Sequence, residues 1–335
     1  MKAASIALVV ILAFVGVALV RLKPWQKPEQ ARAKQELSVG FLPVTCHLTC
    51  PVTDFATKTS DSSRFVSQKF MDFPTVTEAM RAGRLRATFM IAPLAMKLRS
   101  QGLNVKIVYL GHRDGSTVMV AKDSRAKDLR DLKGKTFGIP SKYSNQYLVI
   151  RKLMEDQGVG EDEIRFIEVP PPDMPAALET GAIDAYFVGE PHAAKAELAG
   201  TGRVLYHAKD IWPNFISCAL VVTDDLIRDE PELVRDLVRG IAESGEWAET
   251  HRLEAAKVVA PYYRQDEKLL KYVLTQPPDR VSYVTLVPED EELKKIMDMA
   301  LKVGVIDKRV EMKDMIDRSF IPQEIKPAKI DPNKS

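Results

Sequence analysis

The sequence lacks the short motifs that identify the common classes of enzymes. It contains no Gly-x-Gly-x-x-Gly, no Gly-x-Ser-x-Gly and no His-Glu-x-x-His, which are typical of dinucleotide-binding proteins, hydrolases and zinc peptidases. The segment Gly134-Lys135-Thr136 resembles the end of a phosphate-binding loop, but Leu129 occupies the position of that motif's first glycine. We therefore expect a protein that is not an enzyme and that has no cofactor.

Cysteine is scarce, and its spacing does not complete a zinc motif. The chain has Cys46, Cys50 and Cys218, and His47 beside the first of them adds another soft ligand. A structural zinc ion needs four ligands, and no Cys-x2-Cys or His-x3-His follows, so we expect no metal site. In an oxidising compartment Cys46 and Cys50 could form a disulfide and leave Cys218 free, or the thiols could pack or line a ligand site.

The chain also lacks a strong excess of charge of either sign. Its 48 basic and 46 acidic residues are mixed throughout and give a net charge of +2. This balance does not indicate a nucleic-acid partner or an acidic surface as partner. With 335 residues, 45% of them hydrophobic, the chain is long enough for two domains with cores of their own.

The N-terminus carries an uninterrupted apolar segment. Lys2 precedes the apolar residues 3–20, an arrangement typical of an export signal. The segment is long for a cleaved signal and just long enough to span a bilayer, so residues 1–22 are either a signal or a membrane anchor. A buried core helix is the alternative. We expect export to the periplasm, with residues 3–20 as a possible tether to the inner membrane and 23–36 as a polar linker.

A pattern repeats along the chain at a constant offset of about one hundred residues, which is the size of a domain rather than of a solenoid unit. Residues 77–93 read TEAMRAGRLRATFMIAP, and residues 175–191 read PAALETGAIDAYFVGEP. The same offset relates Gly40 to Gly138. The repeat predicts two lobes that are built alike and face each other across a cleft.

Hydrophobic periodicity predicts strands that alternate with helices, and hence parallel sheets covered by helices on both faces. Strands are expected at residues 37–42, 69–73, 86–91, 105–110, 117–122, 136–139, 164–169, 185–188, 203–207 and 216–222. Helices with a 3.6-residue period are expected at residues 231–250, 252–262, 267–274 and 289–303.

Two of these strands, 118–122 and 217–222, bracket the second copy of the repeat, and we interpret them as crossovers between the lobes. The first lobe is then discontinuous, with residues 37–119 plus 220–320, and the second lobe contains residues 120–219. Residues 321–335 are rich in proline and lysine and are expected to form a loose tail.

Ligands of open parallel sheets bind where the strands end and the following helices begin. Polar or small residues in the corresponding loops are therefore our candidate ligand-binding residues. Each has a structural alternative: Asn145 or Glu190 could only cap a helix, His192 could be solvated, and Trp212 could belong to the core. The candidates are Thr45, Cys46, His47, Ala92, Pro93, Ser141, Tyr143, Asn145, Gly189, Glu190, His192 and Trp212.

Several segments resemble the nitrate/sulfonate/bicarbonate-type substrate-binding proteins of ATP-binding-cassette importers. They are GFLPVT, ATFMIAPLAM, IVYLGHRDG, LKGKTFGIP and AIDAYFVGEPHAAKA, and the resemblance covers roughly residues 37–250. The family includes taurine, aliphatic sulfonate and thiamine-pyrimidine binders. The resemblance implies the two-lobed type II periplasmic binding fold, with two crossover strands and, in this chain, a helical C-terminal region.

The resemblance also implies a function: capture of a small anionic or zwitterionic ligand in the inter-lobe cleft by hinge closure. It implies a membrane permease and an ATPase as partners, and we expect a monomer. The alternatives are binding of a thiamine-pyrimidine precursor, an enzyme on the same fold, or a membrane-tethered periplasmic sensor domain. Cys46-His47 and His192 depart from the family's usual loops, which leaves the identity of the ligand open.

Overall fold

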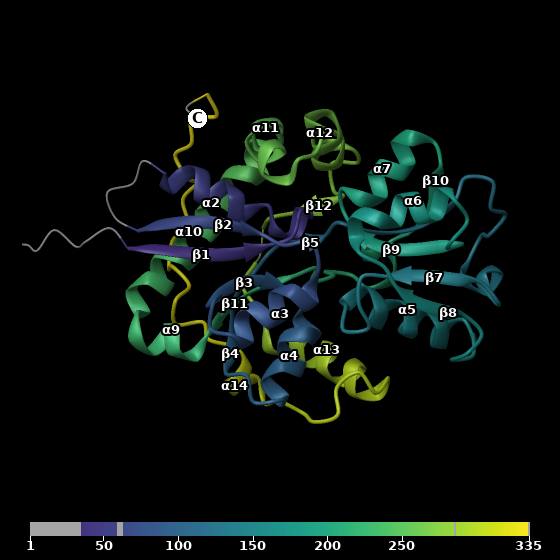
Figure 1. Cartoon of the computed structure of the whole chain (residues 1–335), viewed down its shortest axis with the longest axis horizontal. Coiled ribbons are helices and arrows are strands. Elements are labelled where there is room, and N and C mark those ends of the chain that lie inside the picture. The colour runs from purple at the N-terminus through teal and green to yellow at the C-terminus, as the bar shows by residue number, and fades with distance from the viewer. Residues whose placement is uncertain (1–34, 59–62, 285, 334–335) are drawn as a thin grey trace, which may run out of the picture. The chain divides into compact units, whose positions relative to one another are not determined.

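The computed structural model describes residues 35–58, 63–284 and 286–333 (Figure 1). Residues Glu36–Ser335 form one compact unit. The predicted N-terminal signal or anchor, residues 1–22, lies outside the described residues, as do residues 23–34 of the predicted linker. Within the described part of the chain, none of the helices has the length and apolar character needed to cross a bilayer.

The described unit is built on two five-stranded sheets. The first sheet has the order β2-β1-β3-β11-β4. Its strands are β1 (Glu36–Phe41), β2 (Arg64–Lys69), β3 (Ala87–Met90), β4 (Val105–Leu110) and β11 (Ala219–Thr223). The second sheet has the order β10-β6-β9-β7-β8. Its strands are β6 (Ser116–Ala121), β7 (Thr136–Ile139), β8 (Arg165–Glu168), β9 (Ala185–Gly189) and β10 (Gly202–His207).

Neither sheet is wholly parallel, which corrects the sequence-based expectation. In the first sheet β1 pairs in parallel with β2 and β3, but β11 is antiparallel to both β3 and β4. In the second sheet β6 is likewise antiparallel to β9 and β10. Strands β6 and β11 each enter their sheet from the other sheet rather than from a covering helix, so their direction is reversed.

The repeat in the sequence corresponds to the same helix–turn–strand unit in each sheet. Residues 77–93 contain the end of α3 (Phe73–Arg81) and β3, and residues 175–191 contain most of α6 (Met174–Glu179) and β9. Gly83 and Gly181 occupy equivalent turns with φ of 66° and 74°, a conformation that favours glycine. β3 and β9 are both interior strands that carry the following loop to the same side as the cleft.

The prediction of a strand at residues 69–73 is wrong, because β2 ends at Lys69 and a helix follows. Asp72 is the N-cap of α3, and its carboxylate accepts a hydrogen bond from Thr75 N at 2.8 Å, with a proline in the first turn. This N-cap chemistry decides the boundary.

Replacing Asp72 with Ala is expected to lower the free energy of unfolding by about 1 kcal/mol, since it removes the N-cap bond of α3. Urea unfolding followed by circular dichroism measures the change. Asp72→Asn, which keeps a side-chain oxygen, should retain most of the stability. An equal loss in both variants would contradict the capping role.

Strand β6 pairs with β9 and β10 throughout residues 116–121. The proposed boundary between residues 119 and 120 therefore falls inside a strand of the second sheet. The chain passes between the sheets in residues 111–115 and 213–218, on either side of the second sheet's strands. The lobe limits given above stay a prediction.

The second half of the chain is helical, as expected. The helices are α9 (Asp224–Asp229), α10 (Pro231–Thr250), α11 (Arg252–Tyr263), α12 (Glu267–Thr275), α13 (Asp290–Lys302) and α14 (Met312–Met315). Helix α12 packs against α7 (His192–Ala199) beside the second sheet, and α13 packs between α4 (Ala92–Ser100) and α5 (Asn145–Asp156) (Figure 1). The C-terminal helices thus contact elements of both sheets.

The tail, residues 321–333, contains no helix or strand, but it is not detached from the body. Ile321, Ile325, Ala328 and Ile330 are partly buried and pack against the main core. Ala328 N also donates a hydrogen bond to Glu243 O at 2.9 Å. The expectation of a loose tail is therefore corrected for these residues.

Candidate functional site

A small cavity lies between the two sheets, where strands of both end; we call it the inter-sheet pocket. Its volume of about 20 Å³ is enough for roughly one water molecule. Apart from two cysteines and one glutamine, its lining is apolar, and none of the lining residues is positively charged. The lining residues are Leu42, Val44, Cys46, Phe73, Ile91, Pro140, Gln146, Pro171, Gly189 and Cys218.

Three helices begin at this pocket. Phe73 is the first residue of α3, Ile91 is the N-cap of α4, and Gln146 lies in the first turn of α5. The N–H groups of a helix start carry partial positive charge and attract anions. Gln146 is buried and donates from Nε2 to Ser116 Oγ at 3.1 Å, while its Oε1 has no partner. The pocket therefore offers dipoles and amide groups instead of a formal cation.

Two cysteines and a histidine meet at one edge of the inter-sheet pocket. Cys46 Sγ lies 2.8 Å from Cys218 Sγ, and His47 Nε2 lies 3.1 Å from Cys218 Sγ. Burial by itself raises the pKa of the Cys46 thiol, but hydrogen bonds with Cys218 and His47 and the nearby imidazole charge bring it well below its usual range. This edge of the pocket therefore favours a thiolate on Cys46.

The third cysteine lies elsewhere, so the predicted Cys46–Cys50 disulfide is wrong. Cys50 Sγ faces Val39 O at 3.6 Å and Ser67 Oγ at 3.8 Å. Burial raises the pKa of Cys50, and all three cysteines are free. Cys218, which was expected to be left over, is the neighbour of Cys46.

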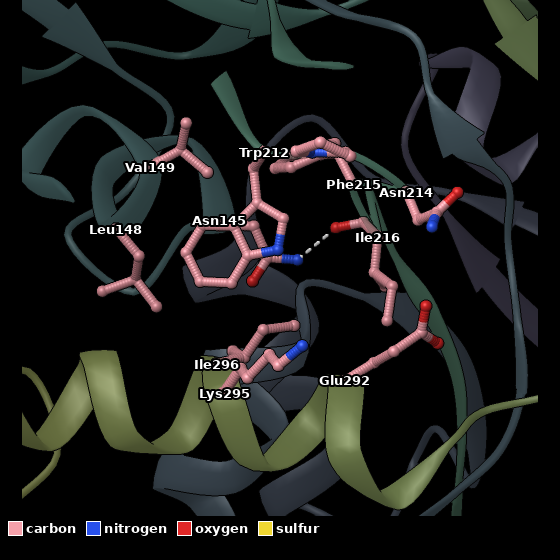
Figure 2. Close-up of a pocket in the computed structure, with 11 residues that line it drawn as sticks. Asn145, Leu148, Val149, Trp212, Asn214, Phe215, Ile216, Glu292, Lys295 and Ile296 are labelled. Atoms are coloured by element: carbon pink, nitrogen blue, oxygen red, sulfur yellow. Dashed lines mark hydrogen bonds between the residues drawn. The ribbon is translucent and has the colours of Figure 1, made fainter. Parts of the chain in front are cut away.

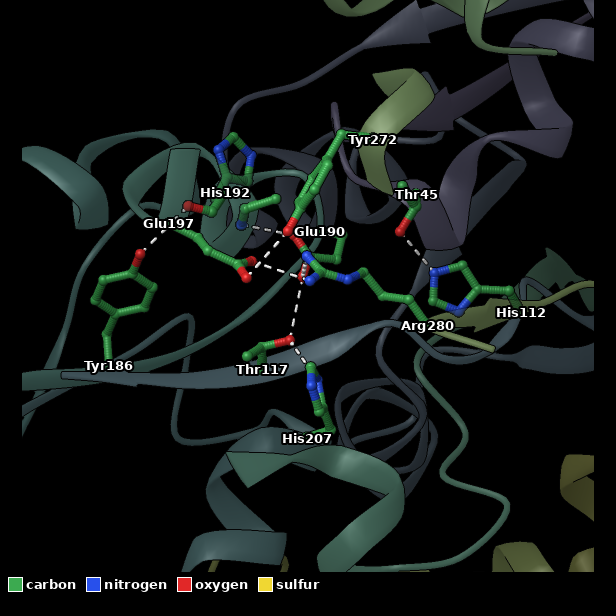
Figure 3. Close-up of polar contacts among 11 residues, drawn as sticks. Thr45, His112, Thr117, Tyr186, Glu190, His192, Glu197, His207, Tyr272 and Arg280 are labelled. Carbon is green, nitrogen blue, oxygen red and sulfur yellow. Dashed lines mark hydrogen bonds and ion pairs between the residues drawn. The ribbon is translucent and has the colours of Figure 1, made fainter. Parts of the chain in front are cut away.

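Glu190 is fully buried in an ion pair (Figure 3). Its Oε1 lies 3.1 Å from Arg280 Nη1 and accepts a hydrogen bond from Thr117 Oγ1 at 3.1 Å. Arg280 also donates to Glu197 Oε2 of α7 at 2.9 Å. Desolvation raises the pKa of the Glu190 carboxyl, and the charge of Arg280 opposes that shift. Glu190 is thus bonded within the protein instead of facing the cavity.

Arg280 was not identified from the sequence. It lies in the short connection between α12 and the strand β12 (Val281–Ser282), ninety positions from Glu190. A single arginine that follows two prolines carries no local signal for a buried role. Only the packing of α12 against α7 brings it to the second sheet.

The turn Gly189–His192 touches the loop that follows β1. Thr45 N donates to Glu190 O at 2.7 Å, so these two walls are in direct contact. Burial lowers the pKa of His192 to about 4, opposed by a hydrogen bond with the Pro43 backbone, and its Nε2 has no partner. His192 is therefore neutral near pH 7.

His112 is a further buried imidazole close to the pocket. Burial lowers the pKa of His112 to about 4, and its Nε2 lies 2.8 Å from Thr45 Oγ1. Tyr283 fixes the same turn by donating from its hydroxyl to Thr45 O at 3.0 Å. The two polar groups of Thr45 are thus occupied by protein partners.

The remaining candidates fall in two neighbouring pockets. Asn145 and Trp212 line a cavity of about 200 Å³ between α5, residues 212–216 and α13 (Figure 2). Ser141 and Tyr143 line another of about 290 Å³ beside α3 and α4. Of the twelve candidates, Cys46 and Gly189 line the inter-sheet pocket. The buried residues beside it are Thr45, His47, Ala92, Pro93, Glu190 and His192.

The arrangement of two sheets and an inter-sheet pocket agrees with the relatives of the chain. The sequence matches the NMT1-like family over residues 30–262, more than half of its length. The chain belongs to the NMT1-like family. This NMT1-like protein is 22% identical over 265 residues to the putative aliphatic sulfonates-binding protein of Bacillus subtilis (strain 168), which covers 77% of each chain.

A second relative of this NMT1-like protein is the nitrate import ATP-binding protein NrtC of Synechocystis sp.. The two are 26% identical over 242 residues, which is 65% of this chain and 36% of the relative. The match is therefore confined to a minor part of that longer protein.

Solved structures show the fold. A zinc-bound ligand-binding component of an ABC-type import system from Staphylococcus aureus has a TM-score of 0.77 at 25% identity, covering 86% of this chain and 98% of that one. The periplasmic nitrate-binding protein NrtA from Synechocystis PCC 6803 also has a TM-score of 0.77, at 13% identity, covering 86% and 87%. The NMT1-like chain has the two-lobed type II periplasmic binding fold, as its sequence predicted.

Proposed function

We propose that this chain is the solute-binding component of an ATP-binding-cassette importer and is not an enzyme. Its ligand is a small anionic or zwitterionic molecule, similar to a sulfonate, taurine or nitrate, captured in the inter-sheet pocket. The observation that carries the proposal is the convergence of three helix starts on a pocket between two sheets. The names of the sulfonate- and nitrate-related relatives support the same class of ligand.

Binding would proceed by hinge closure. The two sheets are joined by the crossing segments 111–115 and 213–218, and a change of backbone angles there would separate the walls. In the present structure the walls touch through Thr45 N and Glu190 O, and the pocket is small. Closure over a ligand would exclude water and strengthen each hydrogen bond to it.

The proposed cellular setting follows from the same function. The protein would be exported to the periplasm, either free or tethered through residues 3–20, and would act as a monomer. A membrane permease with its ATPase would accept the closed, loaded form.

Gln146→Leu is expected to abolish ligand binding, because it removes the amide group that the second sheet contributes to the pocket. Thermal shift with taurine, alkanesulfonates and nitrate detects binding; a ligand at 100 times its Kd should raise the stability of the wild type by about 2.7 kcal/mol. Gln68→Leu, an exposed change on β2, is the matched control and should keep the shift.

Absence of any shift in the wild type with these ligands would contradict the proposed ligand class. A shift that survives in Gln146→Leu would place the ligand outside the inter-sheet pocket. Consumption of the ligand at catalytic rates would contradict a purely binding function.

A further inference from the structure

The pair of buried sulfur atoms beside the inter-sheet pocket has no role in the function proposed above. Cys46 is 3% exposed and Cys218 is 2% exposed, and 172 positions separate them in the sequence. They nevertheless face each other at 2.8 Å and line the same cavity. Two soft ligands at one point of an apolar wall are a chemical feature that packing alone does not require.

The backbone fixes the two cysteines in place. Gly111 N donates to Cys218 O at 2.9 Å. Gly111 also packs so closely on the other cysteine that an added Cβ would lie 2.1 Å from Cys46 O. On the same turn, Tyr263 donates from its hydroxyl to Val44 O at 2.7 Å. The sulfur atoms therefore project from a rigid frame.

The protonation of His47 decides what it can do for the sulfur atoms. Its Nδ1 accepts a hydrogen bond from Leu42 N at 2.7 Å, so the neutral ring carries its proton on Nε2. That Nε2 lies 3.1 Å from Cys218 Sγ and donates to the sulfur. The ring thus has no free lone pair on that side, and the site offers two sulfur ligands and one N–H donor.

We propose that Cys46 and Cys218 bind one copper(I) ion through their two sulfur atoms, and that His47 is a positioning residue that donates Nε2–H to Cys218. Thiolates are soft ligands that select copper(I). Structural zinc takes four ligands, whereas among the described residues the cluster at this point contains only Cys46, His47 and Cys218.

The charges and the space of the site agree with this assignment. Binding releases the thiol protons and yields an ion with two thiolates, which together carry one negative charge. The His47 N–H offsets that charge in a buried setting. The sulfur atoms must move apart to admit the ion, and the pocket that both of them line provides the room. This proposal does not rest on the import function.

Titration of the reduced full-length chain with copper(I), supplied anaerobically as its acetonitrile complex, tests the assignment. Competition with bathocuproine disulfonate should show one bound copper per chain in the wild type. Cys46→Ser and Cys218→Ser should each weaken binding by at least tenfold. Cys50→Ser, the matched change at the cysteine outside the pair, should keep the wild-type affinity and stoichiometry. X-ray absorption should show two sulfur scatterers.

The positioning role of His47 has a separate readout. His47→Gln should still bind one copper, but binding should require a higher pH, because the thiolates lose their imidazole donor. Thermal unfolding of each metal-free variant shows whether it is folded.

Three results would overturn the proposal: a folded Cys218→Ser variant that binds like the wild type, a His47→Gln variant that is folded but binds no copper, or reduced wild-type protein that fails to compete for copper. In the last case, recovery of both thiols only after reductant would identify the pair as a disulfide.

Discussion

Replacing Arg280 with Met is expected to lower the free energy of unfolding by about 3–5 kcal/mol, the range for removing one partner of a buried ion pair. Arg280 and Glu190 side chains are 2% and 0% exposed, so the remaining carboxylate would be left without a counter-charge away from water. Urea unfolding at neutral pH measures the loss.

The pH dependence of this variant provides a second measurement. Without Arg280 the pKa of Glu190, already raised by desolvation, should rise further. A carboxyl whose folded-state pKa exceeds its unfolded value stabilises the fold below the unfolded pKa, and that contribution is lost as the pH rises through the folded pKa. The stability deficit of Arg280→Met should therefore shrink as the pH is lowered.

The double variant Glu190→Gln, Arg280→Met should recover part of the lost stability, since the unpaired charge is gone. Arg309→Met is the matched control, because its pair with Asp298 is nearly half exposed on both sides and should cost at most about 1 kcal/mol. Equal losses at Arg280 and Arg309 would show that the buried pair is not the cause.

Gly111→Ala is expected to destabilise the protein by about 3 kcal/mol or more, because overpacking against a rigid backbone costs in this range. The added Cβ would lie 2.1 Å from Cys46 O and 3.4 Å from Cys218 O. Neither carbonyl can move without breaking the contact between Gly111 and Cys218. The change should also remove copper(I) binding if the variant folds, since it displaces the backbone of both cysteines.

Gly245→Ala is the matched control for this substitution. Gly245 lies within α10, and the nearest atom to its added Cβ is Tyr283 O at 3.5 Å, an ordinary contact. Replacing a helical glycine with alanine should be neutral or stabilise by up to about 1 kcal/mol. A loss at Gly245 as large as that at Gly111 would contradict the steric explanation.

The sequence predicted local features well where the signal was itself local. Helix α10 was predicted at its observed bounds, since its apolar residues recur on one face over twenty residues. The duplicated helix–turn–strand units were found because glycine marks the same turn in each. The missed start of α3 was also local: Asp72 followed by a proline is an N-cap signal that was read as part of a strand.

Features that join distant parts of the chain were not predictable in the same way. The reversed direction of β11 depends on where the chain re-enters the first sheet. Glu190 was interpreted as facing a ligand because its loop follows a strand, but Arg280, ninety positions away, occupies its carboxylate. Cys46 was paired with its nearest cysteine in the sequence, whereas Cys218 is the residue beside it in space.

By itself, the sequence determined the two duplicated α/β units, the helical C-terminal region and the loops where a ligand site belongs, because periodicity, capping and turn residues act over a few positions. Only the tertiary structure decided which side chains in those loops remain open to the pocket. Burial makes the difference, since each polar group that leaves water takes the nearest partner in space, and that partner can come from any point in the chain.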